Sequence, residues 1–592
     1  MAKLRSMITH ANQKIENINK RIEFVLILII SLGVVLGITL GLSTMTSGFH
    51  LVDDHEFLEW TYGVQMQGEN IFSMIRNKVL GDFSWRYEPM YYTTRMLTCY
   101  LFGSNLLPYS LLKATEFFLS IMFLYYSGRQ IGEDKKYSLL FALVSVLGYQ
   151  SPVWWKLGPQ EGQCTMLFAA GFFCMLKWLH EGKKSFMVSS MLLFALMVNY
   201  KESYIILIPF LMLYVLYEEL QKQGGAVTLK AVTEGIRNRL GYLIFLGGCF
   251  LVPVIVILTC VGTNNYGNVG LDSGASLGEY VDGLTRSLQG DLKWFKRFGI
   301  LFGLILLTYY EELKKLWKEM LLTVAFLLPQ FVIFGRSGIG ERYVLPSAIG
   351  FAFFFVVVIS KWKPLSGKRR AVYLLFILLL LGAHTRVTLR EADYFRFRGE
   401  SVTSMLESVR EMASDDTKVL ACFRPNEEGN LTINYWMKLH GFDQVYYYTE
   451  ETGMINRECD INLFYAPEDY EPQSFEDMDI VVMYNRLDRH FAYDLSLDLT
   501  DFTQELSTKI LLYENLVDGL KKDEKQYVIP LQVQFPVVRD KNGKPCIGFY
   551  AGRTHRIVPC PDCKLQPDVL NEIGNTPVSY THLRAHETRH DL

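Results

Sequence analysis

The chain has 592 residues, of which 50% are hydrophobic and 14% aromatic, and its formal net charge is −2. Its mean hydropathy of +0.14 is too low for a chain embedded in a membrane throughout, so it indicates a membrane part joined to a water-soluble part. The near-neutral charge argues against nucleic acid as the main partner.

Eleven hydrophobic runs approach the ~20 residues that cross ~30 Å of hydrocarbon. They lie at about 24–46, 108–127, 136–152, 163–179, 185–200, 203–218, 241–261, 298–310, 317–335, 343–359 and 371–388. If the N-terminal segment 1–23 is cytoplasmic, every predicted inner loop carries Lys or Arg, as the positive-inside rule requires. The pattern predicts an all-α polytopic protein of the cell membrane, with a transmembrane domain over residues 24–389.

The first predicted outer loop, about residues 47–107, contains Asp53 and Asp54 near its start, and Asp53 is the first acid after the first predicted span. Carboxylates at the outer bilayer surface cost free energy unless they have a role or a partner. An enzyme that acts on a lipid-linked substrate needs a general base at that depth, so both acids are candidate catalytic residues. The alternative is that one of them only caps a helix over residues 54–65.

Further patches on the predicted outer side carry candidate side chains for binding a donor phosphate or sugar. These side chains are Arg86, Trp154, Trp155, Glu161, Lys201, Glu202, Arg336 and Arg342. Cations neutralise a phosphate leaving group, and aromatic faces stack on sugar rings. Structural alternatives are an interfacial Arg86–Glu88 ion pair, a Trp154–Trp155 membrane-interface belt and a buried Lys201–Glu202 pair.

The segments around Asp53 and around Lys201 each resemble a motif of GT-C glycosyltransferases. VDDHEF at 52–57 resembles the D-[DE]-x-x-[FY] pattern that follows the first span of protein O-mannosyltransferases and lipid A aminoarabinose transferases. NYKESYIILIP at 199–209 resembles the Lys-Glu motif that opens a later span in related members. The resemblance covers roughly residues 20–390. It implies a polyprenyl-phosphate-linked sugar as donor, transferred with inversion on the extracytoplasmic face to a glycan, lipid or protein acceptor.

Asp53 matches the first position of this pattern, and we therefore assign it as the base. Partial desolvation at the interface is expected to raise the pKa of Asp53. Asp54 points elsewhere and is expected to cap the helix or to bind a divalent metal, although no cofactor is certain. A surface-polysaccharide polymerase or ligase, and a transporter or flippase of lipid-linked substrates, remain alternative functions.

Residues 390–576 are predicted to form an extracytoplasmic α/β domain, with helices at 399–414 and 427–440. Strands are expected at 417–423, 445–449 and 479–484 and near 526–537. Residues 577–592 resemble a translated sequencing adaptor and are excluded from fold reasoning, so we expect the outer domain to be truncated. Cys560 and Cys563 form a lone CxxC, for which a disulfide, free thiols and half a metal site all stay open.

Overall fold

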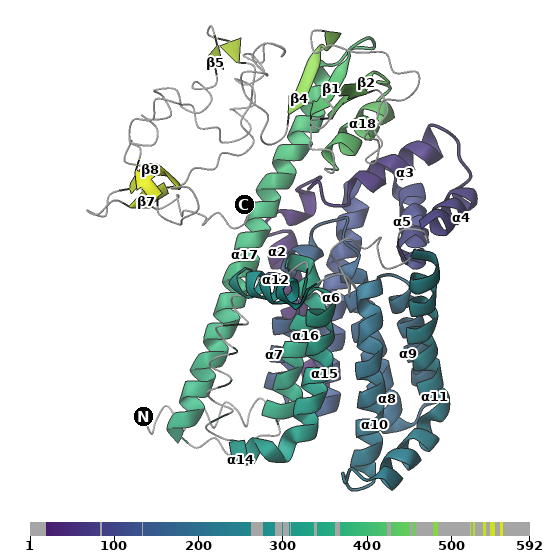
Figure 1. Ribbon diagram of the computed structural model, residues 1–592, viewed down its shortest axis with the longest axis vertical. Helices are drawn as coiled ribbons and strands as arrows, with labels where there is room; N and C mark the ends of the chain where they lie inside the picture. Colours follow the sequence, from purple (N-terminus) through teal and green to yellow (C-terminus); the bar gives the residue numbers. More distant parts are fainter. Residues whose placement is uncertain are drawn as a thin grey trace. The chain divides into compact units, whose positions relative to one another are not determined.

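The structure, a computed structural model, is mostly helical (Figure 1). It describes residues 19–82, 86–132, 134–261, 276–290, 310–336, 340–360, 367–422, 428–449, 454–456 and 477–483, with isolated residues and short strands elsewhere. The chain divides into two compact units, Met1–Thr403 and Ser404–Leu592. The domain boundary predicted near residue 389 falls inside helix α17 (Gly367–Met412), which continues past it.

Six helical segments in the described part of the chain are long and apolar enough to cross a membrane, so this is a multi-pass membrane protein. They are α2 (Lys20–Thr39), α6 (Leu106–Gly132), α8 (Glu161–Glu181), η3 with α10 (Glu202–Lys222), α11 with η4 (Leu229–Val261) and η6 to η7 (Arg342–Ile359). Each of the six coincides with a predicted span.

Four further predicted spans coincide with helices that are shorter or less apolar. They are α7 (Lys135–Val146), α9 (Lys184–Val198), α15 (Trp317–Ile333) and α17. The predicted span at 298–310 lies almost entirely outside the described residues. The number of eleven spans therefore stays a prediction.

The first outer loop folds into three helices, α3 (His55–Gln65), α4 (Ile71–Asp82) and α5 (Pro89–Phe102). Helix α5 starts with Pro89, whose fixed backbone angle suits the first helical position. Figure 1 shows these three helices together at one end of the bundle that contains α8, α9, α10 and α11. The loop thereby places its acidic residues beside the ends of the membrane helices.

Helix α8 packs against α6 and α9. Its aromatic side chains join an apolar core with those of neighbouring helices. Within this core the rings of Phe168 and Phe326 lie 5.4 Å apart, and those of Phe210 and Phe326 lie 4.1 Å apart. Because interiors of this kind are close-packed, the core holds the first turn of α8, where Glu161 lies, in a fixed position.

The second unit contains a four-stranded sheet in the order β3-β2-β1-β4. Strand β1 (Val419–Cys422) pairs parallel to β2 (Val445–Thr449) and to β4 (Ile480–Met483), while β3 (Met454–Asn456) is antiparallel to β2. Helix α18 (Gly429–Leu439) connects β1 to β2 and packs on both. The strands predicted at 417–423, 445–449 and 479–484 coincide with β1, β2 and β4.

Short strands follow in this unit. They are β5 (Lys521–Lys522), β6 (Lys525–Gln526), β7 (Val537–Arg539), β8 (Pro545–Tyr550) and β9 (Ile557–Pro559). Strand β6 overlaps the first residue of the strand predicted near 526–537, and strand β7 overlaps its last residue. Cys560, Cys563 and the adaptor-like residues 577–592 lie outside the described residues.

Candidate functional site

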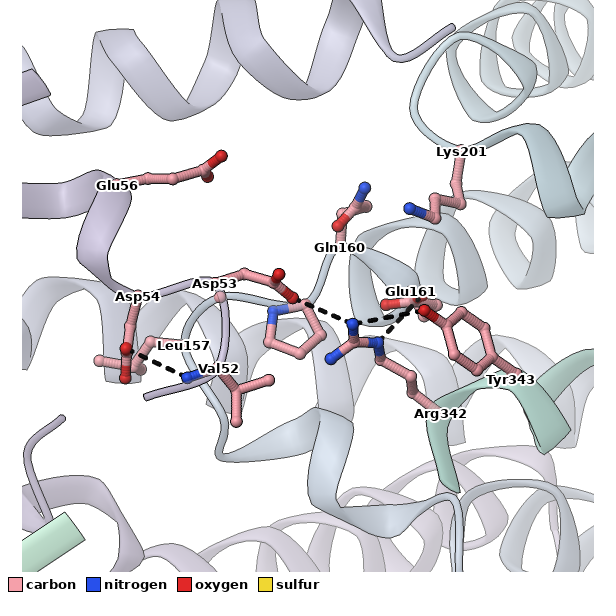
Figure 2. A network of polar contacts seen from close by, with 12 residues as sticks. Val52, Asp53, Asp54, Glu56, Leu157, Gln160, Glu161, Lys201, Arg342 and Tyr343 are labelled. Atoms are coloured by element: carbon pink, nitrogen blue, oxygen red, sulfur yellow. Dashed lines mark hydrogen bonds and ion pairs between the residues drawn. The ribbon is translucent and has the colours of Figure 1, made fainter. Parts of the chain in front are cut away.

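The loop between α2 and α3 holds the two acids in different environments. Asp53 has a backbone φ of 55°, in the left-handed region that Asp tolerates better than most residues. The Asp54 side chain is fully buried and accepts hydrogen bonds from the backbone N–H groups of His50 and Val52, the latter at 3.2 Å (Figure 2). Asp54 therefore fixes the shape of the loop that presents Asp53.

Asp54 occupies the N-cap position of α3, but its side chain makes no capping hydrogen bond. The expectation that it caps this helix was wrong, because the carboxylate faces back to the preceding loop. Within the described part of the chain, no group of three or more His, Cys, Asp or Glu side chains is placed to hold a metal ion.

A second loop, residues 155–160, runs directly against the Asp53 backbone. A Cβ atom added to Gly158 would lie 2.0 Å from the carbonyl oxygen of Val52 and 2.6 Å from the Cβ of Asp53. No side chain fits at such distances, so glycine is required for the two loops to meet. Because the two loops meet here, Glu161, which follows the second loop, lies near Asp53.

Arg342 connects these two loops. Its Nη2 lies 3.2 Å from Oδ2 of Asp53, and its Nε lies 3.7 Å from Oε1 of Glu161 (Figure 2). Glu161 is 1% exposed, and its carboxylate oxygens have no hydrogen-bond partner among the described residues. Its place at the first residue of α8 helps to stabilise this charge, because a helix N-terminus is the positive end of the helix dipole.

Lys201 makes a second connection, between the segment before α5 and the start of η3 (Glu202–Leu207). Its ammonium group forms an ion pair with Glu88 and lies 3.9 Å from Oε2 of Glu202. The other oxygen of Glu88 accepts a hydrogen bond of 2.8 Å from Gln160, and Arg86 lies 3.6 Å from Glu88. Lys201 and Glu88 are 7% and 2% exposed, so this pairing is made largely away from water.

The charges of the site shift its pKa values. Burial raises the pKa of Asp53, but Arg342 and then Lys201 outweigh it and hold that pKa below its ordinary value. The predicted raised pKa of Asp53 was therefore wrong, because the sequence did not show the adjacent guanidinium. Burial lowers the pKa of Lys201, yet Glu88 and Glu202 raise it overall.

Three predicted site residues lie in other surroundings. Arg336 pairs with Glu279 at 2.9 Å, on the amphipathic helix α12 (Leu277–Gln289). Trp154 is fully buried, stacks on Phe117 with ring centroids 4.9 Å apart, and donates its indole N–H to Val146. Trp155 is 3% exposed. Neither tryptophan forms an interfacial belt or presents a free ring face, so the expectation that they stack on a sugar is not supported by this structure.

Sequence reasoning missed the two cations that support the second loop. The guanidinium of Arg95 donates to the carbonyl oxygens of Leu157, at 3.3 Å, and of Gly158. The ammonium group of Lys113 donates to the carbonyl oxygen of Pro159. Lys113 lies inside the predicted span 108–127, and a charge within a span is itself an indication of a functional site.

The fold and site define a multi-pass membrane protein with a cluster of buried acids and cations at one end of its helix bundle. No protein-family model and no curated protein matches the chain. It is similar to the solved structure of ArnT from Cupriavidus metallidurans bound to undecaprenyl phosphate. The identity is 10%, the match covers 71% of this chain and 86% of that one, and the TM-score is 0.42.

Two further similar structures come from Archaeoglobus fulgidus. An oligosaccharyltransferase in the apo form is 12% identical, over 69% of this chain and 63% of that one, with a TM-score of 0.41. The oligosaccharyltransferase AglB, in complex with an inhibitory peptide and a dolichol-phosphate, is 11% identical over 63% and 59%, with a TM-score of 0.35. All three TM-scores are below 0.5, so these similarities alone do not assign a function to this chain.

Proposed function

We propose that this chain is a membrane glycosyltransferase that moves a sugar from a polyprenyl-phosphate-linked donor to an acceptor, with inversion. The observation that carries the proposal is the position of Arg342, 3.2 Å from Asp53 and in a cluster that also contains Lys201. A carboxylate accepts a proton, and guanidinium and ammonium groups bind phosphate. The two requirements of transfer from a lipid phosphate are thereby met in one place.

In the proposed reaction Asp53 accepts the proton of the acceptor hydroxyl or amine as the acceptor atom bonds to the sugar C1. The bond from C1 to the phosphate oxygen breaks, and the phosphate leaves with the bonding electron pair. A single displacement of this kind inverts C1. The leaving phosphate gains negative charge, so Arg342 and Lys201 stabilise the transition state more than the ground state.

The resting ion pair gives this mechanism an order of events. Arg342 forms ion pairs with Asp53 and Glu161. A bound donor phosphate competes for the N–H groups of Arg342 and adds a negative charge beside Asp53. Both changes raise the pKa of Asp53 from its lowered resting value, so Asp53 becomes a stronger base only when the donor is present.

We place the site on the extracytoplasmic face. Asp53 and Lys201 lie at the ends of predicted spans opposite to the basic loops, such as residues 183–184 and 314–315. The positive-inside rule assigns those basic loops to the cytoplasm. The proposed donor therefore presents its sugar on the outer side of the membrane.

The direct test is to incubate the purified protein with a panel of polyprenyl-phosphate sugars and acceptors and to measure the released polyprenyl phosphate. Release that depends on a small acceptor supports the proposed transferase. Release only with a polymeric glycan acceptor would indicate a polysaccharide ligase or polymerase with the same site. Movement of the lipid across vesicles without release of its phosphate would refute the proposal in favour of a flippase.

A further inference from the structure

The second half of helix α17 packs on the loop between α2 and α3, which presents Asp53. The residues that form this contact recur at intervals of three or four, so they lie on one face of the helix. They are Thr388, Ala392, Phe395, Gly399 and Thr403. All of them except Thr403 are buried. This face belongs to the first compact unit of the chain, although most of it lies beyond the predicted end of the transmembrane domain.

Two glycines make the contact possible. Gly399 meets the loop so closely that an added Cβ atom would lie 2.5 Å from the carbonyl oxygen of Ser47 and 2.9 Å from Nε2 of His50. On the side of the loop, a Cβ atom added to Gly48 would lie 1.8 Å from Oγ1 of Thr403. No side chain fits at such distances, so both positions need glycine. The backbone of the loop therefore lies directly against α17.

A hydrogen bond fixes the same contact. The backbone N–H of Phe49 donates to Oγ1 of Thr403 at 3.0 Å, and the next N–H, that of His50, donates to the carboxylate of Asp54. Phe49 and His50 are each 1% exposed, so water cannot readily replace these acceptors. Two consecutive amides of the loop are thus held, one by α17 and one by the residue that follows Asp53.

The loop needs this support because its backbone is strained. Leu51 and Asp53 have φ angles of 54° and 55°, in the left-handed region that residues other than glycine rarely adopt. Such a conformation persists only where the surrounding structure holds it in place. Asp54 and Gly158 hold the later part of the loop, and α17 holds residues 47–50, directly before Leu51.

Helix α17 also contacts the segment that leads to Glu161. The ammonium group of Lys156, in the second loop, lies 3.9 Å from the ring centroid of Phe395, and both side chains are buried. This distance is within the range of a cation–π interaction. Before that loop, the backbone N–H of Gly148 donates to Oγ1 of Thr388 at 2.8 Å. One face of α17 therefore contacts the two segments that carry the acids bound by Arg342.

We propose that Gly399 and Thr403 are positioning residues, which hold residues 47–50 against α17 and thereby keep Asp53 beside Arg342. The contact itself stands on the geometry, whereas its importance for sugar transfer rests on the proposed function. Both residues act through the loop and not on the substrate. The predicted transmembrane domain, residues 24–389, therefore lacks part of the structure that positions its base.

Hydrogen exchange tests the contact without any substrate. Thr403→Val nearly keeps the shape of the side chain and removes the acceptor of the Phe49 N–H, so the amides of residues 47–54 should exchange at least about tenfold faster. Thr403→Ser keeps the oxygen and should exchange within about threefold of the wild-type rate. Gly382→Ala is a control on the same helix, because an added Cβ atom there meets nothing within 4 Å. Wild-type exchange in a folded Thr403→Val protein would overturn the proposal.

Steady-state kinetics test the role of the contact in catalysis. Thr403→Val and Gly399→Ala should lower kcat at least about tenfold, since a small misplacement of a reacting group slows a reaction strongly. KM for the donor should change less than about threefold, because Arg342 and Lys201 lie on other segments. Thr403→Ser and Gly382→Ala should keep kcat within about threefold of the wild-type value. A purely structural role would lower the yield of folded protein and leave the kcat of that protein unchanged.

The two measurements separate the possible failures. Faster exchange together with a normal kcat in Thr403→Val would overturn the positioning role. If Gly399→Ala does not fold, the comparison of Thr403→Val with Thr403→Ser decides, because this pair differs in the hydrogen-bond acceptor. Faster exchange in Thr403→Val, together with a wild-type protein that releases no lipid phosphate from any donor, would instead refute the proposed function.

Discussion

Replacing Asp53 with Asn is the sharpest perturbation of the proposed mechanism, because it removes the charge of the base and retains its shape. Asn tolerates the left-handed backbone at φ 55° as well as Asp does, so the loop conformation should persist. The lost ion pair with Arg342 is at a side chain that is 32% exposed, and such a pair contributes at most about 1 kcal/mol of stability.

The expected effect on catalysis is much larger. Loss of a general base lowers turnover by about 10²- to 10⁴-fold, which corresponds to about 3 to 5 kcal/mol of activation free energy. Arg342 loses its Asp53 partner in this variant, so donor binding should be unchanged or tighter. We therefore expect a large fall in kcat without a rise in KM for the donor.

Asp54→Asn is the matched control. The Asp54 carboxylate is fully buried and accepts hydrogen bonds from two backbone N–H groups, so the amide should cost about 1 to 3 kcal/mol of folding free energy. Thermal unfolding and release of polyprenyl phosphate, measured on both variants, separate the two roles. If Asp53→Asn has normal turnover and Asp54→Asn is folded but inactive, the base is Asp54 and not Asp53. If both variants are active, the glycosyltransferase mechanism is refuted.

Four other predictions follow from the site. Arg342→Ala should lower single-turnover release of lipid phosphate by about ten- to a thousandfold, and normal turnover at normal expression would make Arg342 structural. Gly158→Ala should displace the Asp53 loop and lower kcat at least about tenfold, whereas Gly81→Ala, where an added Cβ meets nothing within 4 Å, should be neutral. As the pH falls, kcat/KM, which reports the free enzyme, should decline with an apparent pKa below 3.8, the ordinary value for Asp53. The decline of kcat should have a higher apparent pKa, because bound phosphate raises the pKa of Asp53. A thiol introduced near residue 430 should react with an impermeant reagent added outside and one near residue 365 should not; the opposite pattern would reverse the proposed orientation.

Most of the helical architecture was predictable, because apolar runs long enough to cross a membrane are a strong indication of transmembrane helices. Successive helices of this kind cross in opposite directions. The convergence of Asp53, Glu161, Lys201 and Arg342 was predictable for the same reason, since helix ends on one side of a membrane lie close together. The individual partners were not predictable. That Arg342 contacts both Asp53 and Glu161, and that Lys201 contacts Glu88, depends on loop conformations that no short pattern encodes.

The position of Trp154 shows why some predicted site residues lie elsewhere in the structure. Trp154 follows a predicted span that extends to residue 152, which places the ring at the membrane surface. Helix α7 instead ends at Val146, and residues 151–154 turn back so that Trp154 packs on Phe117 inside the bundle. Lys113 was overlooked because the two charged residues of this long apolar run, Lys113 and Glu116, change its mean hydropathy little.

The energetics of the cluster bear on why it exists. Ion pairs buried in a protein contribute little net stability, because desolvation of the charges offsets most of their attraction, and apolar replacements of similar volume are often neutral or stabilising. Glu88, Glu161 and Lys201 are each less than 10% exposed, so folding alone gives little reason to place these charges here. The cations lie between segments that are distant in the sequence, and each could exchange a carboxylate partner for a phosphate oxygen. We infer that the cluster is kept for that exchange, with the acids holding the cations in position until a lipid phosphate replaces them.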